Sequence, residues 1–240
     1  MSSHALPLIL EWTVPYIDDS DDLKAVMLSS QLSWTIARSQ LFRSLRKINP
    51  FDSDLLDDLF ETITSSKWSF KHCVHSISFE LKDDDVLSDE DGSYIHNSNA
   101  INDALRRMVS AIDIFTNMRR IYISITSYCN TDIDIDISGV VSAISRAPHR
   151  RELEIDIDAP WDFLEETPEL WAQAAKGLSC LRIRYAEELG SQSILEIVRG
   201  CSQTVTNLSL PALFLQTYPE LPFDLPNLAS FALFENIKSP

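Results

Sequence analysis

The sequence predicts an α/β solenoid, in which parallel strands stack along a concave face and helices cover the convex face. Three observations predict this fold. Short segments with the period of a strand recur from residue 70 onward, helical patterns lie between them, and the segments return after 44, 32, 28, 27 and 23 residues. A composition with 45% hydrophobic and 23% charged residues is that of a folded chain with a sizeable core.

Six segments carry the strand pattern, with apolar residues placed as L-x-x-L-x-L or close to it. They are "CVHSISFEL", "MRRIYISIT", "RRELEIDID", "LSCLRIRYA", "TVTNLSLPAL" and "LPNLASFALF". Their central apolar residues are Ile77, Ile121, Leu153, Leu181, Leu208 and Phe231. Intervals in the twenties with this triplet are typical of leucine-rich repeats, and the longest interval contains an insertion. Arg150 is a misfit, because it stands where the other segments begin with an apolar residue.

Between the strands, apolar residues follow the period of a helix. In residues 99–118 they recur at steps of four and three, as Ile101, Leu105, Met108, Ile112 and Phe115. Further helices are expected over residues 51–66, before Pro148, after Pro168 with Gly177 just past its end, and before Gly200 as a stop.

Aspartates alternate with isoleucines in "TDIDIDISGVV" and again in "ELEIDIDAP". Such spacing could indicate a calcium loop, which needs a glycine at its sharp turn and a glutamate at its twelfth position. With Asp132 as the first ligand, Ile137 and Ala143 occupy those two positions, so the calcium interpretation fails. The solenoid explains the pattern instead, with the isoleucines pointing inward and the aspartates facing water: Ile133, Ile135 and Ile137, then Ile155 and Ile157.

The charge of the chain limits its partners. Asp and Glu total 36 against 20 Lys and Arg, a net charge of −16. Nucleic acid and anionic membrane surfaces attract clustered cations, so neither is an expected partner. The N-terminus lacks a basic signal region, and its apolar run is too short for a signal peptide or membrane helix. The four cysteines form no C-x-x-C pair, which favours free thiols and a cytoplasmic or nuclear location.

Few residues suggest chemistry, and we expect no enzyme activity, metal or cofactor. The run "KHCVH" brings His72, Cys73 and His75 together, but a structural zinc site needs four converging ligands and no matching second pair follows. Cys201 follows the expected helix end at Gly200, where the helix dipole disfavours a thiolate. We therefore expect Cys201 to be a small buried residue of the repeat.

The first fifty residues have a different, mostly helical character. Leu6-Pro7, an acidic turn before a helix at Leu23, Trp34 eleven residues later, and Leu41-Phe42 together resemble an F-box. The combination is similar to the F-box and leucine-rich-repeat proteins abundant in mushroom-forming fungi. The segments "LPNLASFAL" and "RGCSQTVTNLSL" are also similar to repeats of that group.

The resemblance implies two parts, an F-box-like helical segment over residues 1–50 and a leucine-rich-repeat-like solenoid over residues 51–240. Residues 82–99 form an acidic insertion that we expect to be a disordered loop. The box-like segment would dock onto the Skp-type adaptor subunit of a cullin-RING ubiquitin ligase, and the repeats would hold an unidentified protein substrate. The positions that match the F-box motif are Leu6, Pro7, Ile9, Leu10, Leu23 and Trp34.

The alternative is a repeat scaffold for protein interactions with no ubiquitin-ligase role. Pro15 favours it, because a proline there would kink or end the first helix of an F-box. The run "SQLSW" favours it as well, since only its Trp34 fits the V-C-R-x-W run that many F-boxes carry.

Substrate-binding residues are expected on the concave face, where the outward-facing strand residues are charged. They are Glu152, Glu154, Asp156, Asp158, Arg182 and Arg184. The charge is acidic in one repeat and basic in the next, and charge of this kind governs encounter rate and partner choice more than affinity.

The C-terminal end of the solenoid is expected to be unfinished. The last segment, "LPNLASFALFENIKSP", supplies a strand but no following helix and no polar cap, which a solenoid normally needs. Leu228, Phe231 and Leu233 would be shielded on one side only. We therefore expect a short or truncated form whose end is frayed or paired with another chain.

Overall fold

The structure is a computed structural model that describes residues 42–65, 71–82, 98–126, 137–158, 167–185 and 191–234. It also describes residues 22, 25, 26, 33, 36, 37 and 40. The six residues that match the F-box motif, residues 83–97 of the acidic insertion, and Ile133 and Ile135 lie outside the described residues. The expected loop over 82–99 is too long, because Lys82 ends a strand and residues 98–99 begin a helix.

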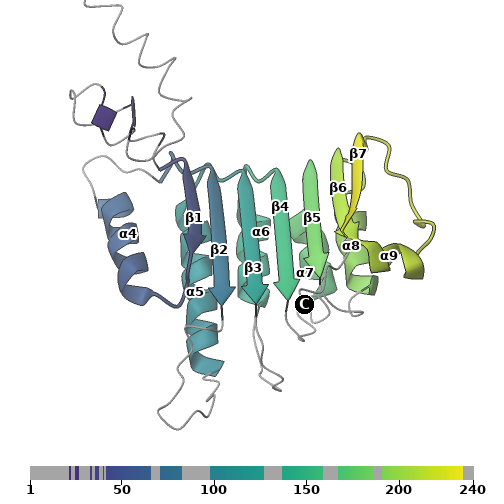
Figure 1. The fold of residues 1–240 in the computed structure, drawn as a ribbon, viewed down its shortest axis with the longest axis horizontal. Coiled ribbons are helices and arrows are strands. Elements are labelled where there is room, and N and C mark those ends of the chain that lie inside the picture. The colour runs from purple at the N-terminus through teal and green to yellow at the C-terminus, as the bar shows by residue number, and fades with distance from the viewer. Residues whose placement is uncertain are drawn as a thin grey trace, which may run out of the picture.

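The described part of the chain forms one parallel sheet whose seven strands follow the order of the sequence. The strands are β1 (Ser44–Ile48), β2 (Ser76–Lys82), β3 (Arg120–Thr126), β4 (Glu152–Asp158), β5 (Cys180–Tyr185), β6 (Asn207–Pro211) and β7 (Ser230–Phe234). The helices are α4 (Ser53–Ser65), α5 (Ser98–Ile114), α6 (Ser138–Arg146), α7 (Pro168–Ala175), α8 (Ser191–Cys201) and α9 (Ala212–Thr217). Figure 1 shows α5 to α8 stacked side by side behind the sheet, which is the repeating strand-and-helix architecture that the sequence predicts.

The expected strand triplets are in register across the sheet. Their central residues pair in one continuous row: Ile77, Ile121, Leu153, Leu181, Leu208 and Phe231. The unequal intervals therefore arise between the strands, both from the connections and from the helices, which have 17 residues in α5 but 8 in α7. From α5 to β6 the connections from helix to strand have four or five residues, whereas those from strand to helix, residues 83–97, 127–137, 159–167 and 186–190, shorten from 15 to 11, 9 and 5 residues.

Apolar and polar residues alternate along each strand, and the apolar ones point into the core. In β4, Leu153, Ile155 and Ile157 are at most 1% exposed, while Glu154 and Asp156 point to the other side of the sheet. The expected apolar face of α5 is buried as well, from Ile101 at 4% to Phe115 at 1% exposure. The interpretation of "ELEIDID" as a strand with its isoleucines inward is therefore confirmed, and Ile137, in the other aspartate-rich run, is also buried.

Strand β1 lies inside residues 1–50, which we expected to form a mostly helical segment, so Ser44–Ile48 departs from that expectation. A bulge separates its two buried residues, Leu45 and Ile48, which pair with Ile77 and Phe79 of β2. Lys47 adopts a φ of 57° within this irregularity. The bulge places the apolar residues three positions apart instead of two, which conceals the strand period in the sequence.

Arg150, which does not fit the strand pattern, connects α6 and α7 through hydrogen bonds. Four other repeats bury an apolar residue here, since Val74, Met118, Leu178 and Val205 are each 0% exposed. The Arg150 guanidinium instead donates hydrogen bonds to five backbone carbonyls, those of Ser145 (2.7 Å), Ala147 (3.0 Å), Ala174 (2.8 Å), Gln173 (3.1 Å) and Lys176 (3.2 Å). These carbonyls lie at the C-terminal ends of α6 and α7, so the Arg150 guanidinium supplies hydrogen-bond donors to both helix ends.

Two glycines behave differently from one another. Gly177 has a φ of +81° directly after the C-cap residue Lys176 of α7, which confirms its expected position past the end of that helix. Gly200 was expected to stop α8 but lies inside it, because the helix continues to Cys201. A Cβ at position 200 would lie 2.3 Å from the carbonyl oxygen of Ala172 in α7, so this glycine permits close contact between the two helices.

The last strand exposes apolar side chains. Phe231 and Leu233 share the core-facing side of the sheet with Leu208 and Leu210, yet they are 44% and 43% exposed. No described helix follows β7, and these two residues remain only partly covered by the described part of the chain.

We expect the backbone amides of Ser230–Phe234 to exchange with solvent at least about tenfold faster than those of Cys180–Tyr185, because a strand covered on fewer sides opens more readily. Hydrogen exchange followed by mass spectrometry on the monomer checks this. Equal protection of the two strands in a monomer would show that the end of the solenoid is covered, against our expectation.

Candidate protein-binding surface

The open face is the side of the sheet away from the helices, and its strand residues project outward in rows. We define it by Ser78 and Glu80 of β2, Arg120, Tyr122 and Ser124 of β3, Glu152, Glu154 and Asp156 of β4, Cys180, Arg182 and Arg184 of β5, and Ser209 of β6. Figure 1 views the sheet from this side, and the helices α5 to α8 lie behind it. Parallel pairing places neighbouring side chains of a row about 4.8 Å apart.

The charged residues of the open face pair with one another across the strands. Arg120 donates through Nε to Glu152 at 2.7 Å. Glu154 accepts from two arginines, since its Oε2 lies 3.3 Å from Arg182 and its Oε1 lies 3.3 Å from Arg184. The acidic repeat and the basic repeat that follows therefore neutralise each other instead of forming two separate patches.

Arg184 is at the centre of this network. Besides Glu154 it lies 3.8 Å from Asp156, and its guanidinium stacks 4.5 Å from the ring centroid of Phe234 in β7. Asp156 also accepts a hydrogen bond from the Tyr122 hydroxyl at 3.3 Å. Burial raises the pKa of that hydroxyl, and the neighbouring carboxylates of Asp156 and Glu154 raise it further, so Tyr122 remains a neutral donor.

Five of the six charged residues expected on this face are thereby brought together: Glu152, Glu154, Asp156, Arg182 and Arg184. Asp158 ends β4, and its side chain lies outside the described residues. Arg120 and Tyr122 belong to the same network and were missed. They flank the central residue Ile121 as Glu152 and Glu154 flank Leu153, so aligning the triplets would have found them.

The cysteines and histidines singled out in the sequence do not gather. Among the described residues, no group of three or more His, Cys, Asp or Glu side chains is placed to hold a metal ion. Cys201 is 1% exposed, and burial raises its thiol pKa to about 12, which confirms the expected buried thiol. Cys180 faces the open side, and burial raises the pKa of its thiol as well.

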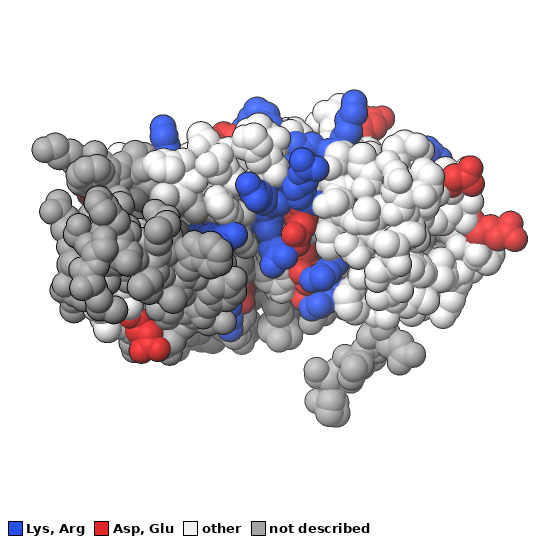
Figure 2. Space-filling view, turned by 90° about the horizontal axis from the view of Figure 1, so that it is seen from above, with Lys and Arg blue, Asp and Glu red and all other residues white. Residues whose placement is uncertain are grey.

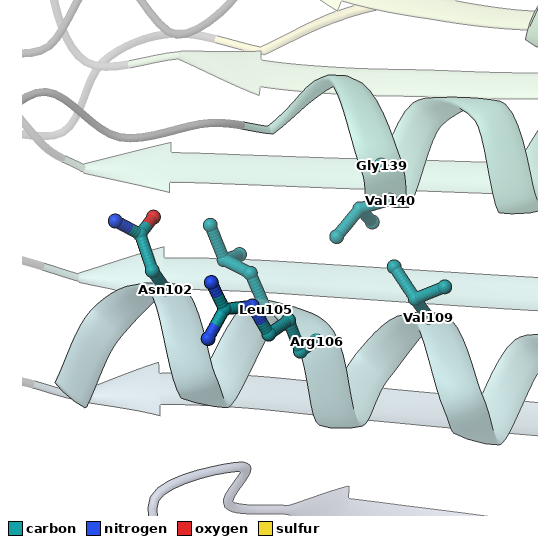
Figure 3. Close-up of a pocket in the computed structure, with 6 residues that line it drawn as sticks. All are labelled: Asn102, Leu105, Arg106, Val109, Gly139 and Val140. Atoms are coloured by element: carbon teal, nitrogen blue, oxygen red, sulfur yellow. The ribbon is translucent and has the colours of Figure 1, made fainter. Parts of the chain in front are cut away.

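A small hollow lies on the helix side of the molecule, between α5 and α6 (Figure 3). It has a volume of about 150 Å³ and is lined by Asn102, Leu105, Arg106, Val109, Gly139 and Val140. Sites for small molecules usually have about 300 to 1,000 Å³ and several converging polar groups. Arg106 is paired with Asp103 at 2.7 Å, so the hollow offers little beyond apolar packing.

No described helix is both long and apolar enough to cross a membrane. A scan against known protein-family models found no match, and no curated protein matched the chain.

Proposed function

We propose that this protein recruits a protein substrate through the open face and docks through its N-terminal segment onto the Skp-type subunit of a cullin-RING ubiquitin ligase. The observation that carries the recruitment step is the charged network on the open face. The docking step is supported by the resemblance of residues 6–45 to an F-box. On this proposal the chain itself performs no catalysis, and other subunits transfer ubiquitin.

Three properties of the open face favour a protein partner. Its side chains project from one continuous parallel sheet, and a rigid platform lowers the entropy that binding must overcome. It combines both signs of charge with a tyrosine, and arginine and tyrosine are enriched at the centres of protein interfaces. The ion pairs Arg120–Glu152 and Arg182–Glu154 hold these side chains in place before a partner arrives.

A crossed capture experiment tests both halves of the proposal. The full chain is tagged, chemically crosslinked to its partners in fungal cells and analysed by mass spectrometry. We expect charge reversal at Asp156 and Asp158 to remove substrate proteins while the Skp-type subunit is retained, because only the open face changes. We expect the Leu10→Glu and Leu23→Glu pair to do the opposite.

Matched controls accompany each variant. Charge reversal at Asp103 and Asp113 changes the net charge equally, but on α5, where they pair with Arg106 and Arg146. Phe231→Glu with Leu233→Glu introduces the same two charges at exposed apolar residues of β7. Failure of the parent chain to retain a Skp-type subunit would refute the ligase role and favour the scaffold alternative. Unchanged substrates after reversal at Asp156 and Asp158 would place the substrate site elsewhere.

A further inference from the structure

One position in each repeat forms a row along the edge where the strands begin. The carbonyl of each row residue accepts two backbone N–H groups from the next repeat, as that of Arg119 does from Arg151 at 2.7 Å and Glu152 at 3.0 Å. The same bonding joins the whole row, which runs Arg43, His75, Arg119, Arg151, Ser179, Thr206 and Ala229. We call the first four residues the basic row. Neighbours lie about 4.8 Å apart, so the basic row spans roughly 14 Å.

The three arginines of the basic row have no acidic partner among the described residues. Arg43, Arg119 and Arg151 are all exposed, and no ion pair to a carboxylate is formed by any of them. The other described arginines on the faces of the sheet and the helices do have partners. Arg106, Arg120, Arg146, Arg182, Arg184 and Arg199 each pair with a carboxylate, and Arg107 and Arg150 donate to carbonyls. Within the described part of the chain, Arg46 of β1 reaches only the hydroxyl of Ser44, at 3.5 Å.

These three arginines lie in one row without an acidic partner among the described residues, in a chain that has 36 acidic residues and 20 basic ones. Figure 2 looks onto this edge and shows Lys and Arg side chains gathered over its middle, with some Asp and Glu side chains between them, beside a largely uncharged surface. Like charges at this spacing repel one another, so the basic row costs folding free energy unless an anion lies against it.

His75 lies between Arg43 and Arg119 in the row, and their positive charges act on its imidazole. Burial, and then the charges of Arg43 and Arg119, hold the pKa of its imidazole below the ordinary value. Its Nδ1 is buried and has no hydrogen-bond partner among the described residues. A neutral His75 thus separates Arg43 from the Arg119–Arg151 pair, and its ring can itself take part in a hydrogen bond with a bound ligand.

We propose that the basic row is a docking site for a short, extended acidic segment of a partner protein. Each arginine presents a planar fork of donors that matches a carboxylate. A span of roughly 14 Å corresponds to four or five residues of an extended peptide at about 3.4 Å per residue. The basic row ends at Arg151, and the next position is the uncharged Ser179, so the segment is held over the first repeats and not along the whole edge.

Nucleic acid fits this edge less well. The row contains no Phe, Tyr or Trp on which bases could stack, and stacking supplies much of the affinity for single strands. The net charge of −16 repels a long polyanion, whereas a short acidic segment lies mostly within about 8 Å of the arginines, the screening length in physiological salt. The inference holds whether or not the chain serves a ubiquitin ligase, and its test uses no ligase subunit.

Fluorescence anisotropy with the full chain and a labelled peptide of seven glutamates provides the test. We expect the peptide to bind the parent chain at low salt and to lose affinity as salt rises, while a peptide of seven glutamines does not bind. The pair Arg119→Gln and Arg151→Gln is expected to weaken binding by about tenfold or more, as two charge-assisted contacts are lost. The control pair Arg146→Gln and Arg199→Gln removes the same charge from the helices and is expected to change affinity less than about twofold.

Chemical protection provides a second measurement that needs no variant. An arginine-specific reagent is applied to the parent chain with and without the glutamate peptide, and modified sites are mapped by mass spectrometry. We expect protection at Arg43, Arg119 and Arg151 and none at Arg106. The proposal is overturned if the glutamate peptide does not bind, if both variant pairs weaken binding equally, or if a short single-stranded RNA binds more tightly than the peptide.

Discussion

Replacing Gly200 by alanine is expected to destabilise the protein by about 3 kcal/mol. The added Cβ would lie 2.3 Å from the carbonyl oxygen of Ala172 and 3.0 Å from its Cα, and both atoms belong to the backbone of α7. A rotamer change cannot relieve this contact, so α7 and α8 must move apart and open the core around Trp171. Denaturant unfolding of the variant and the parent gives the difference in free energy.

Gly139→Ala is the matched control, because Gly139 also lies inside a helix, α6. Its added Cβ would meet only the side chain of Val109, at an ordinary distance of 3.5 Å. Alanine is preferred over glycine in helices, so we expect this variant to be unchanged or more stable by roughly 0.5 kcal/mol. Equal effects at the two positions would show that the close approach of α7 and α8 does not determine the cost at Gly200.

Replacing Arg150 by methionine is expected to cost roughly 3 kcal/mol. Methionine restores the apolar character of the other repeats at this position, yet it leaves five carbonyls of two helix ends without their charged donor. A partly buried carbonyl that loses its donor is costly, and water can reach only some of the five. Urea unfolding measures the loss.

The control for Arg150 is Arg146→Met. Arg146 pairs with Asp113 at 2.8 Å on the helix surface, where its side chain is 55% exposed, so we expect its loss to cost less than about 1 kcal/mol. Arg150→Lys should fall between the two, because one ammonium cannot reach carbonyls on both helices. A more stable Arg150→Met protein would mean that the apolar pattern outweighs the hydrogen bonds.

The strands from β2 onward were predictable because each one carries its own alternation of apolar and polar residues. Aligning these alternations also shows which residues pair between neighbouring strands. Ile121 and Leu153 sit in equivalent triplets, and they are paired in the sheet. Strand β1 was missed because its bulge at Lys47 changes the local period. The helix α9 was missed too, since six residues with a single buried position, Phe214, carry almost no periodic signal.

Features that depend on two distant segments were harder to predict. Gly200 suggested a helix stop, because the approach of Ala172 is a property of two packed helices and not of either sequence. The outward position of Glu154 was predictable, but its pairing with both Arg182 and Arg184 requires the register of β4 and β5. The charged network can therefore be predicted by aligning the repeats with one another, but not from the sequence of a single repeat.

The connections between repeats have a consequence for how such a chain can change in evolution. Between β2 and β6 the connections at the edge where strands end have 15, 11, 9 and 5 residues, while the returning connections from α5, α6, α7 and α8 keep four or five residues. Doubling the length of a flexible loop costs only about 0.6 kcal/mol in closure entropy. Insertions and deletions on the variable edge are therefore nearly neutral for folding, whereas one on the short edge would shift a whole strand against its neighbours. Whole repeats of unequal length can be gained or exchanged as long as the short return is inherited intact.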